Sequence, residues 1–98
     1  MPGFFDELSK NYGLRPDGTP KGKGWLGPLK MKDGGTMTEY SMGIELGGKE
    51  FLIPSIVPTL SKEEIDHLLE GGDITPTIFK KAVDHARPFI LKGESPFK

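Results

Sequence analysis

Apolar and polar side chains alternate near the middle of the chain, and this alternation predicts a β-hairpin. Every second residue from 40 to 46 is large and apolar, which is the pattern of a half-buried strand. Gly47-Gly48 follows and supplies the positive φ angles of a two-residue primed turn, and residues 49–53 then provide a second strand. Pro54 cannot donate a hydrogen bond to a ladder, so we expect it to end that strand.

Two helices are predicted after the hairpin. Ser61-Lys62-Glu63-Glu64 has the composition of a capping box, and Gly71-Gly72 is expected to end the first helix. Thr75-Pro76 is typical of a second helix start. An apolar stripe then recurs at steps of three and four residues: Ile78, Phe79, Ala82, Val83, Ala86, Phe89 and Ile90. Pro88 lies within this stripe and is expected to kink or interrupt the helix just before it.

The N-terminal third carries no such period, and 12 of its first 35 residues are Gly or Pro. A short amphipathic piece at residues 4–10 has the pattern of one or two helical turns, and Pro16-Asp17-Gly18 is typical of a β-turn. The rest of residues 1–23 is expected to be an extended basic arm. The sequence therefore predicts an α+β fold over residues 24–98, with a β-hairpin packed against two C-terminal helices.

Chain length and composition narrow the class of protein. A chain of 98 residues supports one core of modest stability, and an oligomer is a natural source of further burial. There is no Cys, which excludes disulfides and thiolate sites. No apolar run approaches the ~20 residues that cross a bilayer, and the N-terminus lacks the pattern of a signal peptide. We expect no membrane association and no export by a signal of its own.

Charge is distributed unevenly although the net charge is only −1. Six bases lie between positions 10 and 32 against the single acid Asp17. Arg15, Lys21 and Lys23 are therefore candidate contacts for an anionic partner, the alternative being a solvated Lys-rich linker. Tyr12 and Trp25 interleave with these bases, which keeps nucleic-acid binding as a lesser alternative.

The residues capable of catalysis do not form a recognisable motif. His67 and His85 lack partners at metal-ligand spacing. The serines sit in no nucleophile elbow, and the glycines of residues 18–24 are neither preceded by a strand nor followed by a helix, as a phosphate loop requires. We predict a non-enzymatic protein without cofactor or metal; a hydrolase or metal enzyme built around His85 is the competing hypothesis.

Two apolar segments are stiffened by glycine and proline. The first, residues 24–29, contains the only Trp of the chain, and the second, residues 54–60, is bracketed by prolines. Rigid segments lose little entropy on docking, so we interpret them as a partner-binding surface. A hydrophobic plug that pins the arm to the core is the alternative for the Trp. The predicted contact residues are Trp25, Leu26, Leu29, Ile56, Val57 and Pro58.

Several separated motifs resemble a small module of tailed bacteriophages and prophages, which occurs alone or within larger phage proteins. They are GWLGPL at residues 24–29, TEYS at 38–41, GKE at 48–50, IPSIVPTL at 53–60, AVDHA at 82–86 and SPF at 95–97. The resemblance implies a phage protein in the virion or the host cytoplasm, and carries over no catalytic residue. We therefore predict a binding or assembly module for a phage or host protein or for itself. A nucleotide-binding inhibitor of host defence is the alternative.

Overall fold

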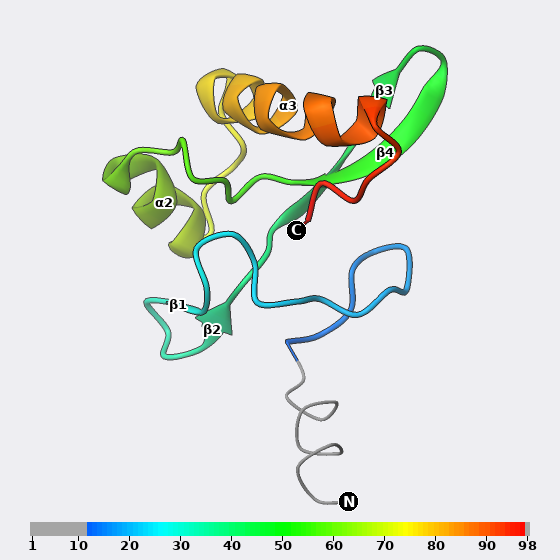
Figure 1. Cartoon of the computed structure of the whole chain (residues 1–98). Coiled ribbons are helices and arrows are strands. Elements are labelled where there is room, and N and C mark those ends of the chain that lie inside the picture. Colours follow the sequence, from blue (N-terminus) through cyan, green and yellow to red (C-terminus); the bar gives the residue numbers. More distant parts are fainter. Residues whose placement is uncertain (1–11, 98) are drawn as a thin grey trace, which may run out of the picture.

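The computed structural model describes residues 12–97, and the expected helical turns at residues 4–10 lie outside them. The described elements form an α+β fold of two antiparallel hairpins and two helices, as predicted (Figure 1). Their order is β1 (Leu29–Lys30), β2 (Thr36–Met37), β3 (Ser41–Leu46), β4 (Lys49–Pro54), α2 (Lys62–Leu69) and α3 (Pro76–Leu91). None of the helices in this part of the chain is long and apolar enough to cross a membrane.

The β3–β4 hairpin forms as predicted. Gly47 and Gly48 take φ angles of 59° and 80°, and both are thus in the left-handed region that a primed two-residue turn requires. The ladder runs from Leu46 opposite Lys49 to Ser41 opposite Pro54, the last residue of β4. Because side chains alternate along a strand, the hairpin presents one apolar face and one face that carries glutamates.

Both helices begin at the predicted caps. The Ser61 hydroxyl accepts from the Glu64 amide at 3.1 Å, and the Glu64 carboxylate accepts from the Ser61 amide at 2.7 Å. The Thr75 hydroxyl caps α3 by accepting from the Ile78 amide at 3.2 Å. α3 continues through Pro88 to Leu91, so the interruption predicted at this proline is absent. Pro88 lies in the last turn, where its missing N–H removes only one bond near the helix end.

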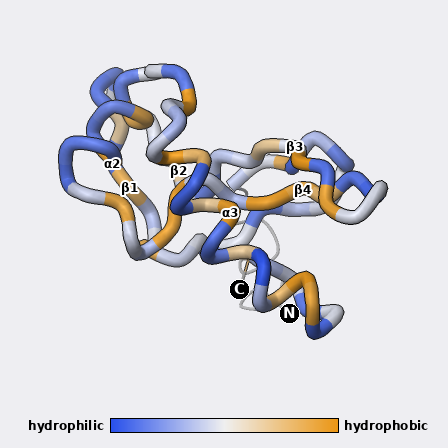
Figure 2. The backbone as a smooth tube through the Cα atoms, turned by 90° about the horizontal axis from the view of Figure 1, so that it is seen from above, coloured by the Kyte–Doolittle hydropathy of each residue, from blue (hydrophilic) through white to orange (hydrophobic). Residues whose placement is uncertain are grey.

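The core consists of two clusters of buried side chains. The apolar face of β3–β4 packs against the middle and end of α3, and Figure 2 shows hydrophobic stretches of β4 and α3 side by side. The buried members of this cluster are Ile44, Ile53, Ala82 and Ala86. The other cluster joins the chain after β4 to both helices, and its buried members are Ile56, Val57, Leu60, Leu68 and Ile78.

The segment before β3 is more structured than predicted. Leu14 pairs with Pro20 across the expected turn, in which the Gly18 amide donates to the Arg15 carbonyl at 2.9 Å. The short β1–β2 hairpin, with Leu29 opposite Met37, was not predicted, because two-residue strands show no alternation. Residues 12–23 therefore form a looped segment rather than an extended arm.

Candidate functional site

A buried carboxylate ties the looped segment to the rest of the domain. The Glu39 side chain is 1% exposed and accepts from Arg15 Nε at 2.7 Å, Arg15 Nη2 at 2.9 Å and the Gly22 amide at 2.9 Å. The Arg15 guanidinium also stacks over the Phe97 ring, 4.0 Å from its centroid. Arg15 was predicted to meet an anionic partner; instead its charge is neutralised within the chain. The predicted boundary after residue 23 is likewise bridged by these bonds.

The chain then approaches itself closely at Gly24. This residue has φ +77°, and an ideal Cβ placed on it would overlap the Thr38 carbonyl oxygen. Only glycine combines the left-handed conformation with the absence of that atom. Gly24 therefore allows the looped segment to lie against the residue before Glu39, which determines where the next residue, Trp25, sits.

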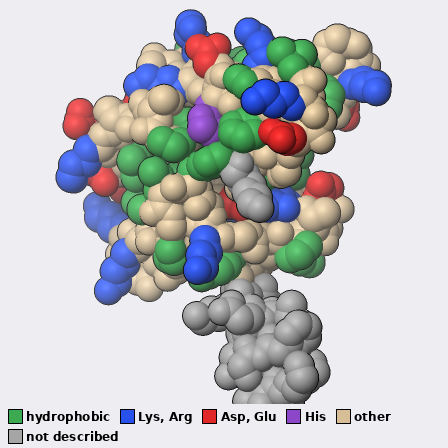
Figure 3. Space-filling view, viewed as in Figure 1, with side chains coloured by type: hydrophobic (Ala, Val, Ile, Leu, Met, Phe, Trp, Pro, Cys, Tyr) green, Lys and Arg blue, Asp and Glu red, His purple; other side chains and the backbone are tan. Residues whose placement is uncertain are grey.

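Trp25 is the centre of a small aromatic cluster. Its Nε1 donates to the Pro96 carbonyl at 2.8 Å. The indole meets the His85 ring edge to face, with centroids 4.7 Å apart and planes at 87°, and contacts Phe89 at 5.4 Å. All three rings remain partly exposed. Figure 3 shows a face of the molecule on which hydrophobic side chains gather around a histidine.

The His85 ring packs against two aromatic neighbours. Its Nε2 is buried and has no hydrogen-bond partner among residues 12–97. Burial lowers the pKa of His85 below its usual 6.5, because desolvation disfavours the charged imidazolium. The neighbouring Asp84 pairs with Lys80 Nζ at 2.7 Å rather than with the imidazole, and that hydrogen bond is the main cause that lowers the pKa of Asp84.

Two of the serines and His67 form hydrogen bonds within the fold, whereas the buried Ser41 hydroxyl has no partner among the described residues. The Ser55 hydroxyl donates to the Tyr40 carbonyl at 2.7 Å, and Ser61 caps α2. His67 Nε2 lies 2.7 Å from the Asp73 carbonyl oxygen. No group of three or more His, Cys, Asp or Glu within the described residues has the arrangement of a metal site.

Two open cavities flank the aromatic cluster. One, of about 470 Å³, lies between the looped segment and the C-terminal tail and includes Lys23, Trp25 and Phe97 in its wall. The other, of about 430 Å³, is lined by His85 and Phe89 and by residues at its rim, including Thr59 and Pro88. Both have the volume of sites that accept small ligands or protruding side chains.

The structure divides the predicted docking residues into exposed and buried ones. Ile56 and Val57 are 1% and 0% exposed in the core, so no partner can reach their side chains. Their burial follows from the chain direction after β4, which carries this segment beneath both helices. Leu26 and Leu29 pack partly buried on the same cluster, while Pro58 is exposed. Lys23 is exposed and Lys21 is partly buried.

His85 and Phe89 were not predicted as neighbours of Trp25. Their spacing of four residues on a helix places them on one face, and this spacing is the only feature of the sequence that indicates that they lie side by side. The sequence did not indicate that Trp25 would pack there, because the contact joins positions 60 residues apart or more and depends on the turn at Gly24.

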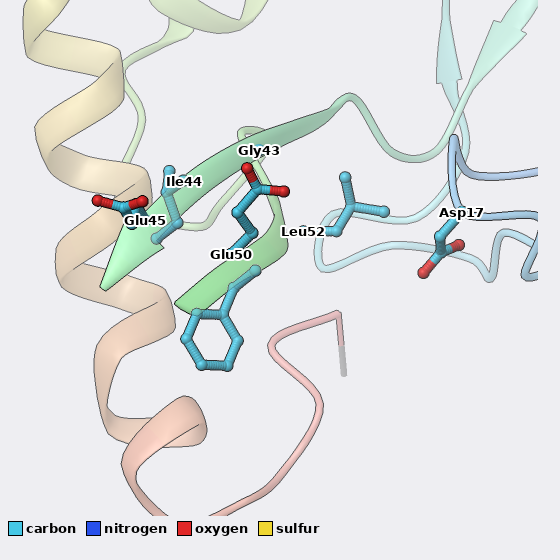
Figure 4. Close-up of a pocket in the computed structure, with 7 residues that line it drawn as sticks. Asp17, Gly43, Ile44, Glu45, Glu50 and Leu52 are labelled. Carbon is cyan, nitrogen blue, oxygen red and sulfur yellow. The ribbon is translucent and has the colours of Figure 1, made fainter. Parts of the chain in front are cut away.

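A third cavity, of about 600 Å³, lies on the face of the β3–β4 hairpin that bears glutamates (Figure 4). Its wall includes Gly43, Glu45, Glu50 and Leu52, together with Asp17 from the looped segment. This cavity is separate from the two beside Trp25, because it shares no lining residue with them.

Comparison with known proteins adds no relative: no protein family model, curated protein or solved structure matches the chain.

Proposed function

We propose that the chain is a non-enzymatic binding and assembly module of a tailed bacteriophage, in the virion or in contact with a host protein. A partner protein docks over Trp25, His85 and Phe89. The observation that carries this proposal is the state of Trp25, which is fixed by a hydrogen bond and two ring contacts while it remains partly exposed. Trp25 lines one cavity, and its ring neighbours His85 and Phe89 line the other. The phage assignment is supported by the sequence resemblance.

Fixed aromatic side chains are favourable docking sites. Trp offers a large contact area at small entropic cost, and residues of this kind carry much of the binding energy at protein interfaces. Here the indole is already immobilised, so a partner would not bear the cost of ordering it. The flanking cavities supply concave surface into which partner side chains insert.

The polar side chains support a binding role over catalysis. Glu39 forms an ion pair with Arg15, and Asp84 forms one with Lys80. A general base or nucleophile needs a partner that activates it and a place for the reacting atom. Both carboxylates are instead paired with a cation, and the Nε2 of His85 has no hydrogen-bond partner among residues 12–97.

Site-specific photocrosslinking tests the proposal. A photoreactive amino acid is placed at Thr59, on the rim of the cavity beside His85, or at Thr77, an exposed residue of α3 outside every described cavity wall. Both variants are expressed during infection, and crosslinks are analysed from purified particles and from host cells. We expect one protein to crosslink from position 59 and not from position 77. Identical crosslinks from both positions, or none from position 59, would contradict docking at this site.

A second candidate function is supported by the cavity between the looped segment and the C-terminal tail. Its wall combines the exposed Lys23 with the rings of Trp25 and Phe97, a combination that suits a nucleotide. Binding would raise the melting temperature in proportion to ligand occupancy. Thermal unfolding with millimolar nucleoside mono- and triphosphates tests this function: Lys23→Ala should abolish a ligand-induced rise, and no rise in the wild-type chain would exclude it.

A further inference from the structure

The β3–β4 hairpin has one face that no described element covers. α3 packs against the face with Ile44 and Ile53. On the opposite face Glu45 and Glu50 are exposed and Leu52 is partly exposed, and Gly43 contributes no side chain. The cavity of about 600 Å³ lies over these residues, and Figure 4 shows Glu50 and Leu52 along β4 with Asp17 at the far side. This face therefore combines a hollow, an apolar side chain and acidic groups.

The acidic groups on this face repel one another. Glu45 and Glu50 are directly opposite in the ladder, and two like charges in this position destabilise a hairpin. Neither carboxylate forms an ion pair with a cation of residues 12–97. A cationic group from another molecule would remove the repulsion and gain an ion pair at the same time.

The opposite side of the molecule carries cationic groups that suit this face. The β1–β2 hairpin and the β3–β4 hairpin lie at opposite sides of the described part of the molecule in both backbone views (Figures 1 and 2). Lys30 and Lys32 are exposed in the first hairpin, and neither is ion-paired within the described chain. The nearby Asp33 directs one carboxylate oxygen to the Gly35 amide, at 2.9 Å.

We infer that a second copy of this chain docks its β1–β2 hairpin on the acidic face of β3–β4, with Lys30 and Lys32 near Glu45 and Glu50. The two surfaces lie at opposite sides of the molecule, so the contact is head to tail. A head-to-tail contact leaves one acidic face and one basic hairpin unused in a dimer, and it continues into a ring or a filament. The contact does not involve Trp25, so it is independent of the proposed function.

Analytical ultracentrifugation with charge-reversed variants tests this contact. At low ionic strength the wild-type chain should associate above its 10.8 kDa monomer mass, and the association should weaken with added salt, because the pairs are at the surface. E45K/E50K and K30E/K32E should each weaken self-association by at least about tenfold, a loss of about 1.4 kcal/mol. E70K/E94K has the same change in charge as the first variant at exposed positions outside the cavity, and it should associate like the wild type.

An equimolar mixture of E45K/E50K with K30E/K32E provides the decisive test. Each variant repels its own copies, but the basic face of one then meets the acidic hairpin of the other, so the mixture should recover association. A wild-type chain that stays monomeric at low salt would overturn the contact. So would undiminished association of E45K/E50K, or a mixture that remains monomeric.

Discussion

At the level of single residues, Glu39 shows how a costly group is accommodated in a small core. A carboxylate that is 1% exposed has lost nearly all its hydration, which costs several kcal/mol unless donors replace the water. Two N–H groups of Arg15 and the amide of Gly22 are those donors. The looped segment is thus held in place because it supplies the hydrogen-bond donors that the buried carboxylate needs.

Removal of the arginine should therefore destabilise the fold strongly. Arg15→Met leaves Glu39 buried with only one of its three donors, and we expect it to lower the free energy of unfolding by about 3 kcal/mol. R15M/E39Q removes the stranded charge and keeps an acceptor for Gly22, so it should recover more than half of that loss. Urea unfolding measures both. A loss below about 0.5 kcal/mol for R15M would mean that the pair behaves as an ordinary surface ion pair.

Gly24 and Gly27 offer a matched test of the close approach to Thr38. Their φ angles are +77° and +75°, but an added Cβ meets the Thr38 carbonyl at Gly24 and nothing within 4 Å at Gly27. Gly27→Ala should cost about 1 kcal/mol through backbone strain alone. Gly24→Ala should cost at least about 2 kcal/mol more, because the backbone must also move apart. Equal losses of the free energy of unfolding in chemical denaturation would show that the close approach of Gly24 to Thr38 does not affect stability.

His85 should make stability depend on pH. Burial lowers its pKa in the folded chain, so below the unfolded value of about 6.5 the unfolded chain binds more protons. The free energy of unfolding should therefore fall as the pH drops from 7.5 to about 5. His85→Phe keeps a ring against Trp25 without the titration, and its stability should decline less over the same range. If the free energies of unfolding of the two proteins fell equally over this pH range, His85 would not be the group responsible.

At the level of elements, the predictions succeeded where local pattern and local chemistry agree. The β3–β4 hairpin and the starts of α2 and α3 depend on contacts within a few residues, such as the capping box at Ser61. The β1–β2 hairpin was missed because its strands are two residues long. Of the kink or interruption predicted at Pro88, the interruption is absent, since α3 is held beyond that point by partly buried Ile90 on the hairpin cluster.

The cost of Pro88 to α3 is measurable. Pro88→Ala restores one backbone donor in the last turn and removes the clash of the ring with the preceding turn. We expect the free energy of unfolding to rise by about 1–2 kcal/mol, less than for a proline at a helix centre. Thermal or urea unfolding measures the change. An unchanged or lowered stability would show that the proline is favourable in its present conformation.

At the level of the whole molecule, long-range contacts decide which predicted residues form a site. The bond from Arg15 to Glu39 spans 24 positions and that from Trp25 to Pro96 spans 71, and no local pattern indicates either. For the same reason the proline-bracketed segment was interpreted as surface, although Ile56 and Val57 are core residues. The sequence draws attention to Trp25, a large aromatic side chain between glycines, but does not indicate the rings that surround it.

The central claim is that a partner docks beside Trp25 on a surface that is already formed. The most direct measurement is the dissociation constant of the partner captured from position 59 for the wild-type chain, Thr59→Arg and Thr77→Arg, by isothermal titration calorimetry. Both residues are exposed, so neither change should disturb the fold. Thr59→Arg should weaken binding at least about tenfold, or about 1.4 kcal/mol, while Thr77→Arg binds like the wild type. Equal affinities for all three chains would contradict the claim.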